Sequence, residues 1–422
     1  MTLDAVIDTV ENALRRGLTL LALGALIGCA SLAPRIPPPT AEEMSSQDMS
    51  LGIRTLAADG QFEYLSSNTV IERLRARLGR RPISVLALSR GGSNGAFGAG
   101  IVIGWTRSRS RPDFSVVTGV SAGALIAPLA FLGPAWDPKI VEIYTTGVSE
   151  RVLRRRFLGG LVGSSLYSSE HLEKLIELYA NDTLLAAVAR EGSKGRLLLV
   201  ATTDLATGEP VIWDLTSIAM HGGRDTKPLF QSILLASASV PGMLPPVRIK
   251  IRSAGTVRTE THVDGGLTQP FFVAPAPDDL PSEAGGAPQP MMIRVIINGT
   301  LNDVPSATAG SARSIFRRSV AAAMTWMMKS TLEHAVEVSR ARGIDLEYAA
   351  IPPTYPLGDG FDFSAATQRA LFQYGSTCAQ TGRLWSGAQT ASTAAVRLSN
   401  GQGMPCPVGD SYLARFGADP QP

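Results

Sequence analysis

A serine flanked by glycine on both sides at two-residue offsets is the first candidate for chemistry in this chain. It is Ser121, in the segment TGVSAGA at residues 118–124. In the pattern G-x-S-x-G, a serine between a strand and a helix stands clear of the sheet and can attack an acyl carbonyl. Gly119 and Gly123 would let the strand and the helix approach closely without a Cβ clash. A plain turn is the alternative, so the neighbouring sequence decides between the two.

A second glycine-rich turn, SRGGSNGAFG, covers residues 89–98. Acyl transfer needs donors aimed at the oxyanion of the tetrahedral intermediate, each contributing about 3 kcal/mol. The backbone N–H groups of Gly91, Gly92 and Ser93, at the start of a predicted helix, are the candidates. The alternative is a dinucleotide-binding turn. It is disfavoured because Arg90 stands where the first glycine of G-x-G-x-x-G belongs.

These two turns require strands before them and helices after them, and the sequence predicts both. Residues 83–89 (ISVLALS) and 114–120 (FSVVTGV) are short apolar runs typical of buried strands, and an apolar helical segment follows each turn. Such repetition predicts an α/β fold with three α/β/α layers and a mostly parallel central sheet. Further strands are expected within 195–215, 291–300 and 344–353, and helices at 69–79, 228–240, 314–339 and 364–386.

Composition limits the classes of function. The chain has 422 residues, 45% of them hydrophobic and 18% charged, with a net charge of +3. This length allows a large buried core. The charges are balanced and form no long basic block, which argues against nucleic-acid binding. No CxxC pair or His/Cys cluster is present, so we expect neither a metal site nor a cofactor.

The N-terminal region has the character of a targeting segment. Arg15 and Arg16 precede an apolar run at residues 17–28, then Cys29 and a proline-rich stretch. The run is shorter than the roughly 20 residues that a membrane span needs. Residues 26–29, LIGC, resemble the bacterial lipobox, in which the cysteine is lipidated. The alternative is a short buried helix with an incidental cysteine, and the acidic residues before Arg15 are consistent with a different translation start.

We therefore expect three parts: a lipoprotein signal peptide at residues 1–29, a tether and lead-in at 30–80, and a hydrolase domain at 81–422. The protein would be exported and lipid-anchored to a bacterial membrane, on the outer-membrane or periplasmic side in a Gram-negative cell. Beyond Cys29, the remaining cysteines are Cys378 and Cys406. They would form one disulfide or remain two separate buried thiols.

Five segments, taken in their order along the chain, resemble motifs of the patatin-like phospholipase family. The turn SRGGSNG is similar to the family's oxyanion loop, GVSAG to its nucleophile elbow, and VDGG at residues 263–266 to its D-G-G/A motif. Two supporting stretches, TDLATGE at 203–209 and ASASVPGMLPPV at 236–247, also match. The motif core spans about residues 83–275, with residues 276–422 as a C-terminal extension of the same domain.

The resemblance implies hydrolysis of lipid esters by a Ser121–Asp264 dyad, with a membrane lipid as substrate. Burial would raise the pKa of Asp264 toward the working range of a general base. Gly265 and Gly266 would let the aspartate's loop pass close beneath the serine. An Asx turn is the alternative for an isolated D-G-G. This chain departs from the family pattern at Arg90 and Asn94, which replace a glycine and an arginine of the oxyanion loop.

Two other functions fit parts of the sequence. A conventional α/β-hydrolase would use a triad of Ser121, Asp264 and His334, which occur in the chain order that such enzymes use. A non-catalytic lipoprotein would bind lipid or a partner in the same pocket, and the altered oxyanion loop motivates that alternative. The arginine-rich segment at residues 151–160 is a solvated helix face or a contact with anionic headgroups. Nothing in the sequence indicates a particular protein partner.

We expect Cys29 to be acylated and the mature chain to be membrane-bound, because the short apolar run ends at LIGC. Metabolic labelling with a fatty-acid analogue should mark the wild-type chain and leave the Cys29→Ser variant unlabelled. Equal labelling of the two proteins would contradict this expectation.

Overall fold

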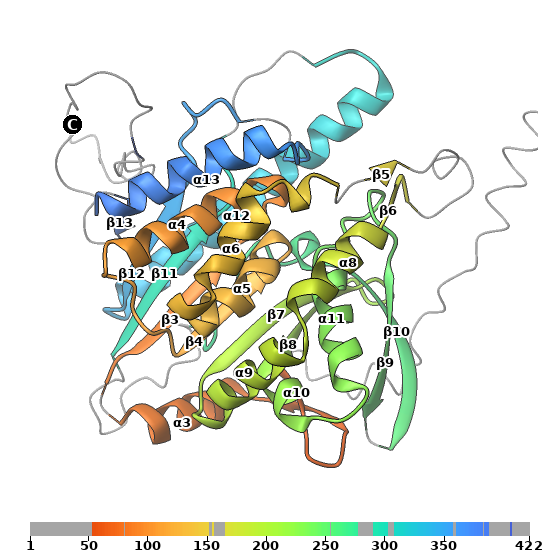
Figure 1. The fold of residues 1–422 in the computed structure, drawn as a ribbon, viewed down its shortest axis with the longest axis vertical. Helices are drawn as coiled ribbons and strands as arrows, with labels where there is room; N and C mark the ends of the chain where they lie inside the picture. The colour runs from red at the N-terminus through yellow and green to blue at the C-terminus, as the bar shows by residue number, and fades with distance from the viewer. Residues whose placement is uncertain are drawn as a thin grey trace, which may run out of the picture.

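A computed structural model describes most of the chain after residue 52. The described residues are 53–79, 81–151, 154–155, 165–253, 255–276, 290–302, 308–357, 360–382, 384–387 and Cys406. Cys29 and the predicted signal peptide lie outside them, as does most of the arginine-rich segment at 151–160. An 11-stranded sheet runs through the described part, with helices packed on both faces (Figure 1).

The centre of the sheet is parallel, as the sequence predicts. Its strands lie in the order β12 (Asp345–Ala350), β11 (Met291–Ile297), β3 (Ile83–Leu88), β4 (Val116–Val120) and β7 (Leu197–Asp204). β3, β4 and β7 are buried along their whole length, which explains their continuous apolar runs. Leu88 pairs with Gly119, so the two glycine turns leave the sheet at the same edge.

Antiparallel strands flank this centre. β8 (Pro210–Asp214) pairs with β7, and β13 (Ser386–Gly387) pairs with β12. A hairpin of β9 (Val247–Ser253) and β10 (Thr256–Asp264) joins β7 through β10. This hairpin was not predicted from the sequence. A separate small pair is formed by β5 (Arg154–Arg155) and β6 (Tyr167–Ser168).

The lead-in differs from its prediction as a polar, partly helical segment. β1 (Ile53–Leu56) pairs with β8, and β2 (Phe62–Leu65) pairs with β1, so both strands extend the main sheet. α3 (Ser67–Leu78), which was predicted, follows them and packs on the sheet. The folded unit therefore includes residues from 53 onward and does not begin at 81. The predicted boundary is wrong because strand pairing is a long-range property that a short polar segment does not reveal.

Helices cover both faces, which confirms the three-layer α/β/α architecture. On one face lie α4 (Gly95–Arg107), α5 (Ala122–Leu132), α6 (Asp137–Thr145), α8 (Glu170–Tyr179), α9 (Asp182–Ser193), α10 (Leu215–His221), α11 (Thr226–Ser237) and α13 (Ala365–Gln380). The other face carries α3 and α12 (Ala312–Ala341). Alternate strand side chains serve the two layers: Leu86 and Leu88 belong to the first core, and Val85 and Ala87 to the second.

α13 packs against α4, the helix that follows the first glycine turn. A Cβ at Gly100 or Gly104 of α4 would lie 2.1 Å from a backbone oxygen of α13, so the two helices pack backbone to backbone. Cys378 of α13 forms a disulfide with Cys406, with 5.2 Å between the Cα atoms. Of the two possibilities for these cysteines, the structure has the disulfide.

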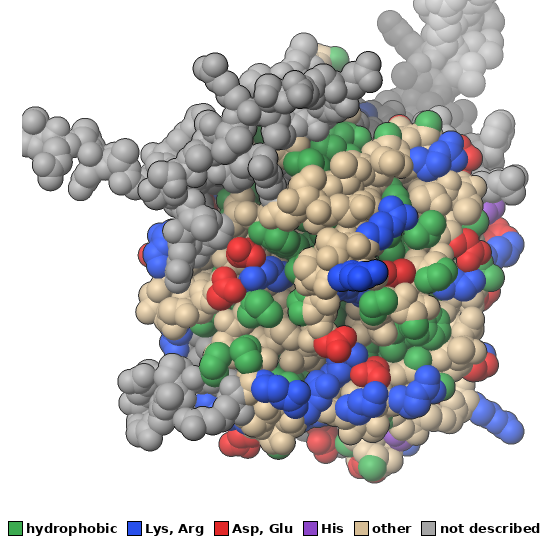
Figure 2. Space-filling model, turned by 60° about the vertical axis from the view of Figure 1, so that its left-hand side comes forward, with side chains coloured by type: hydrophobic (Ala, Val, Ile, Leu, Met, Phe, Trp, Pro, Cys, Tyr) green, Lys and Arg blue, Asp and Glu red, His purple; other side chains and the backbone are tan. Residues whose placement is uncertain are grey.

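The surface shows mixed charge. On the face in Figure 2, basic and acidic side chains lie close to one another, and hydrophobic side chains form separate groups. Among the described residues, no helix combines the length and the apolar character needed to cross a membrane.

Candidate active site

The predicted nucleophile lies on a strained turn between a strand and a helix. β4 ends at Val120, α5 begins at Ala122, and Ser121 between them has φ 55° and ψ −122°. Its backbone N–H donates to Ser237 Oγ at 3.0 Å. The flanking glycines are required for close packing, because a Cβ at Gly123 would lie 2.2 Å from Leu88 O and one at Gly119 2.7 Å from Gly123 O. This is the geometry of a nucleophile elbow.

Ser121 and Asp264 are in direct contact, although 143 positions separate them in the sequence. Ser121 Oγ donates to Asp264 Oδ2 at 2.6 Å. Asp264 ends β10, and its other oxygen, Oδ1, accepts from the Gly266 N–H at 2.7 Å. Ser121 and Asp264 are each only 4% exposed. A Cβ at Gly265 would lie 2.3 Å from Ala201 O, so only glycine lets this loop pass so close to β7.

The surroundings of Asp264 suit it to accept a proton. Burial raises the pKa of its carboxyl group to about 6. The hydrogen bonds from Ser121 and Gly266, together with the positive charge of Arg90, oppose this rise. The carboxyl group is therefore ionised at neutral pH but holds a proton more strongly than an exposed aspartate.

The glycine turn after β3 offers backbone donors beside Ser121, but not all those predicted. The sequence predicts the Ser93 N–H as a candidate oxyanion donor. In the structure this N–H donates to Gly360 O at 2.8 Å, so it is already bonded. No hydrogen bond from Gly91 N or Gly92 N to another described residue is present. Gly92 has φ 57°, and a Cβ there would lie 2.3 Å from Gly360 O. The start of α5 adds the N–H of Ala122, a residue that was not named among the donors predicted from the sequence.

Two side chains hold this turn in place. Asn298, just after β11, donates from Nδ2 to Ser89 O at 2.8 Å and accepts from the Gly98 N–H at 3.0 Å. Arg90 donates to the backbone oxygen of Met324 in α12 at 2.5 Å. A Cβ at Gly266 would lie 2.3 Å from Arg90 Cδ, so the arginine stem packs on the aspartate's loop. Arg90, which replaces a glycine of the family's oxyanion loop, thus connects the glycine turn after β3 with the loop that follows Asp264. It does not line the pocket.

A buried polar network holds β10, the strand that carries Asp264. Glu260 forms a 2.6 Å ion pair with Arg54 of β1 and contacts His262 Nε2 at 3.0 Å. His262 Nδ1 lies 3.0 Å from Thr202 Oγ1, which also accepts from Trp213 Nε1. Burial alone would raise the pKa of Glu260, but the His262 hydrogen bond and the Arg54 charge lower it overall. Both ring nitrogens of His262 are therefore occupied away from the dyad.

No histidine among the described residues hydrogen-bonds to Ser121 or Asp264. His334 is exposed on α12, whereas Ser121 and Asp264 are buried and bonded to each other directly. His221 is exposed at the end of α10, and His171 lies in the first turn of α8. The geometry does not bring His334 into a triad. Among the described residues, no group of three or more His, Cys, Asp or Glu side chains could hold a metal ion.

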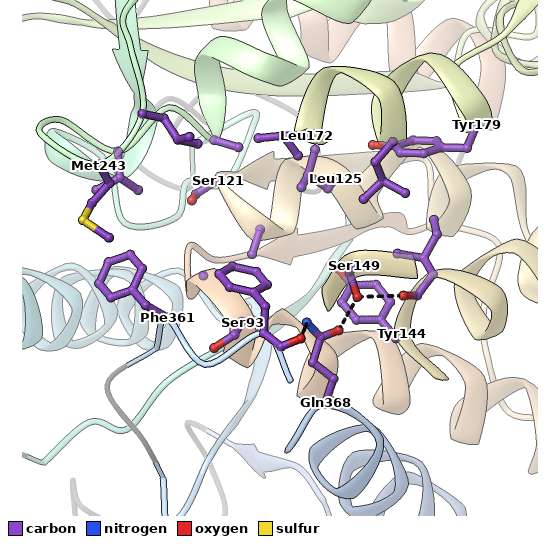
Figure 3. Close-up of a pocket in the computed structure, with 18 residues that line it drawn as sticks. Ser93, Ser121, Leu125, Tyr144, Ser149, Leu172, Tyr179, Met243, Phe361 and Gln368 are labelled. Carbon is purple, nitrogen blue, oxygen red and sulfur yellow. Dashed lines mark hydrogen bonds between the residues drawn. The ribbon is translucent and has the colours of Figure 1, made fainter. Parts of the chain in front are cut away.

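An apolar pocket opens beside Ser121 (Figure 3). In this view Met243 and Phe361 lie on one side of Ser121, and Leu125, Leu172, Tyr144 and Tyr179 lie on the other. Phe361 is 39% exposed, whereas Tyr179 is 3% exposed, so the pocket runs from the surface into the core. Further apolar lining comes from Ile143, Leu175, Val240, Leu244 and Phe363.

Polar side chains in the pocket wall are few. Ser149 donates to Gln368 Oε1 at 2.6 Å, as the dashed line in Figure 3 shows. The Tyr179 hydroxyl is buried without a hydrogen-bond partner. Burial raises the pKa of both Tyr144 and Tyr179, so their hydroxyls stay neutral. The cavity beside the nucleophile thus favours an uncharged, largely apolar group.

Comparison with known proteins agrees with this geometry. Residues 86–277 match the family model described as patatin-like phospholipase. No match was found among curated proteins. Among solved structures, the crystal structure of VipD from Legionella pneumophila overlaps 83% of this chain and 74% of its own, with 13% identity and a TM-score of 0.32. That overlap is too loose to inform fold or function, so the assignment rests on the family match. This chain therefore contains a patatin-like phospholipase domain, spanning residues 86–277.

Proposed function

We propose that this protein is a serine acyl hydrolase that cleaves ester bonds of phospholipids or related lipids through an acyl-enzyme. The family match supports lipid hydrolysis in general. The observation that carries the finer proposal is the 2.6 Å hydrogen bond from Ser121 Oγ to the buried Asp264 carboxylate, beside an apolar pocket. A nucleophile bonded directly to a base needs no imidazole between them.

In the first half of the reaction, Ser121 Oγ bonds to the ester carbonyl carbon while Asp264 takes the hydroxyl proton. The carbonyl π electrons move onto oxygen and form the tetrahedral oxyanion. The N–H groups of Gly91, Gly92 and Ala122 are the available donors for this charge, and the positive end of the α5 dipole adds to them. Collapse of the intermediate breaks the bond to the alcohol, which leaves with the proton from Asp264.

In the second half, water replaces the alcohol. The water oxygen attacks the acyl carbon of the acyl-serine while Asp264 accepts a proton from the water. The new oxyanion uses the same donors, and collapse returns the proton to Ser121 Oγ with release of a carboxylic acid. Throughout, the Gly266 N–H holds Asp264 Oδ1, so Oδ2 stays directed at the serine.

The pocket supports a lipid acyl chain as the group on the carbonyl. Leu125, Leu172 and Leu175 line it between Ser121 and Tyr179, and an acyl chain there would be removed from water. The alcohol part of the ester would then point toward the exposed side of the pocket, near Phe361. We also propose that the enzyme is exported and anchored through Cys29, which would place it at a membrane that contains its substrate.

Replacing Asp264 by Asn should reduce ester hydrolysis by about 10²–10⁴-fold, because the general base is lost. His334→Ala should keep activity within about tenfold, since His334 is exposed on α12. Hydrolysis of a soluble nitrophenyl ester and labelling by a fluorophosphonate probe measure both. Loss of activity in a folded His334→Ala protein to the level of Ser121→Ala would indicate a triad, and no labelling of the wild type would indicate a non-catalytic lipid-binding protein.

Gly92→Val should remove most turnover, whereas Asn94→Ala should retain it. A valine at φ 57° is strained, and its Cβ would meet Gly360 O, so the backbone donors would move. The loss of one donor lowers kcat by about 10²–10³-fold. Steady-state kinetics on the soluble ester, with thermal melts as the folding control, make the comparison. If Asn94→Ala lost as much activity as Ser121→Ala, the Asn94 side chain would itself be a donor.

Activity should rise with pH through about 6, because Asp264 accepts a proton only as the carboxylate. Below that value kcat/KM should fall about tenfold for each pH unit. Arg90→Gln removes a positive charge that lowers the pKa of Asp264, so the acid limb should move to higher pH. A pH profile of kcat/KM for both proteins tests this. A limb centred near the ordinary aspartate value of about 3.9 would contradict the assignment.

A further inference from the structure

The long helix α12 has two halves in different surroundings. It runs for 30 residues, about 45 Å. Its second half packs on the sheet through Met328, Leu332 and Val336, which are buried. From 314 to 327, by contrast, no side chain is buried. The first turns, cyan in Figure 1, extend beyond the body of the molecule.

This projecting half carries large apolar side chains in contact with solvent. Phe316 is 70% exposed, Trp326 62% and Ile315 52%. Val320 is also exposed. At about 100° per residue, these four side chains fall within a sector of about 140° on the side opposite the packed residues. Clustered aromatic and aliphatic exposure of this kind marks an interaction surface.

Basic residues border the apolar sector. Arg317 lies beyond one edge of it, and Arg318 and Lys329 lie beyond the other, by the same helical spacing. The Lys329 ammonium group sits 4.3 Å from the centre of the Trp326 ring. From the start of α12 no acidic residue occurs before Glu333. An apolar face with tryptophan and phenylalanine, bordered only by positive charge, is the pattern of a helix that lies in the interface of an anionic bilayer.

The helix is fixed beside the candidate active site. The backbone oxygen of Met324, within the projecting half, accepts from the Arg90 guanidinium group. Arg90 directly precedes the donor glycines Gly91 and Gly92, and its stem packs on Gly266 of the aspartate's loop. A surface that held this helix would therefore lie next to both catalytic loops.

We propose that the apolar sector of α12, made by Ile315, Phe316, Val320 and Trp326, docks the protein on anionic phospholipid bilayers. This contact is separate from any lipid on Cys29. It inserts the four side chains among the acyl chains and places Arg317, Arg318 and Lys329 at the level of the phosphates. Binding does not require catalysis. Its consequence for turnover, delivery of bilayer lipid to the pocket, rests on the proposed function.

The binding test uses the full chain with Cys29→Ser and Ser121→Ala, so that neither an acyl anchor nor hydrolysis contributes. This protein should float with vesicles of phosphatidylglycerol and phosphatidylcholine, and less with phosphatidylcholine alone or at high salt. Adding Phe316→Ser and Trp326→Ser should weaken the apparent affinity by at least about tenfold. The matched control is Leu178→Ser with Val257→Ser, which removes 54%- and 58%-exposed apolar side chains elsewhere and should bind normally. Arg317→Glu with Arg318→Glu should also weaken binding, selectively on anionic vesicles.

Activity provides an independent measurement in the Cys29→Ser chain with Ser121 intact. The Phe316→Ser, Trp326→Ser variant should hydrolyse a soluble short-chain ester at the normal rate but lose hydrolysis of vesicle lipid. If the Cys29→Ser chain hydrolysed neither the soluble ester nor vesicle lipid, the proposed function would be contradicted. The flotation experiment would then by itself test whether α12 docks on bilayers. Equal flotation of this variant and the matched control would overturn the proposal. So would a dimer in solution that the variant converts to monomer while the parent fails to float, since the sector would then bind a second copy.

Discussion

Ser121 is held at φ 55°, a backbone conformation that costs a residue with a side chain about 1–3 kcal/mol. The rest of the site is arranged around this turn. β4 in the middle of the parallel sheet fixes its start, α5 fixes its end, and the Ser237 hydroxyl bonds its N–H. The strain serves to place the serine hydroxyl above the sheet edge, where the carboxyl ends of β3 and β4 bring the donor loop alongside.

A buried carboxylate is the second costly feature, and in the proposed mechanism its burial is what suits it to act as a base. Removing Asp264 from water raises its pKa, but too much desolvation would leave it protonated and inactive. The bonds from Ser121 and Gly266 and the charge of Arg90 limit the rise. Its position depends on β10, which the Arg54–Glu260 ion pair joins to β1. The N-terminal strands thus help to place a carboxylate 210 positions away.

Apolar side chains line the pocket beside Ser121 and also lie exposed on the first half of α12. In the pocket they line a cavity that begins at the surface near Phe361 and ends at buried tyrosines. On α12 the same kinds of side chain face solvent on one half of a helix and the core on the other. Arg90 connects the two regions, since it reaches from the donor loop to Met324. In the proposed docking, a bilayer held by α12 would therefore lie next to the donor loop.

The sequence alone determined the features that follow local rules. Continuous apolar runs such as 83–89 predicted the buried parallel strands, and the glycines around Ser121 predicted the elbow, because each depends on neighbouring residues. Five motifs in order predicted the family and the pairing of Ser121 with Asp264. What only the tertiary structure decided depends on residues far apart in the chain. The Gly360 carbonyl accepts the Ser93 N–H, so this N–H is not available to an oxyanion. Residues 53–56 form a strand that pairs with β8. His262 bonds to Thr202 and Glu260, and His334 stays at the surface, because pairing partners and burial are set by the packing of distant segments.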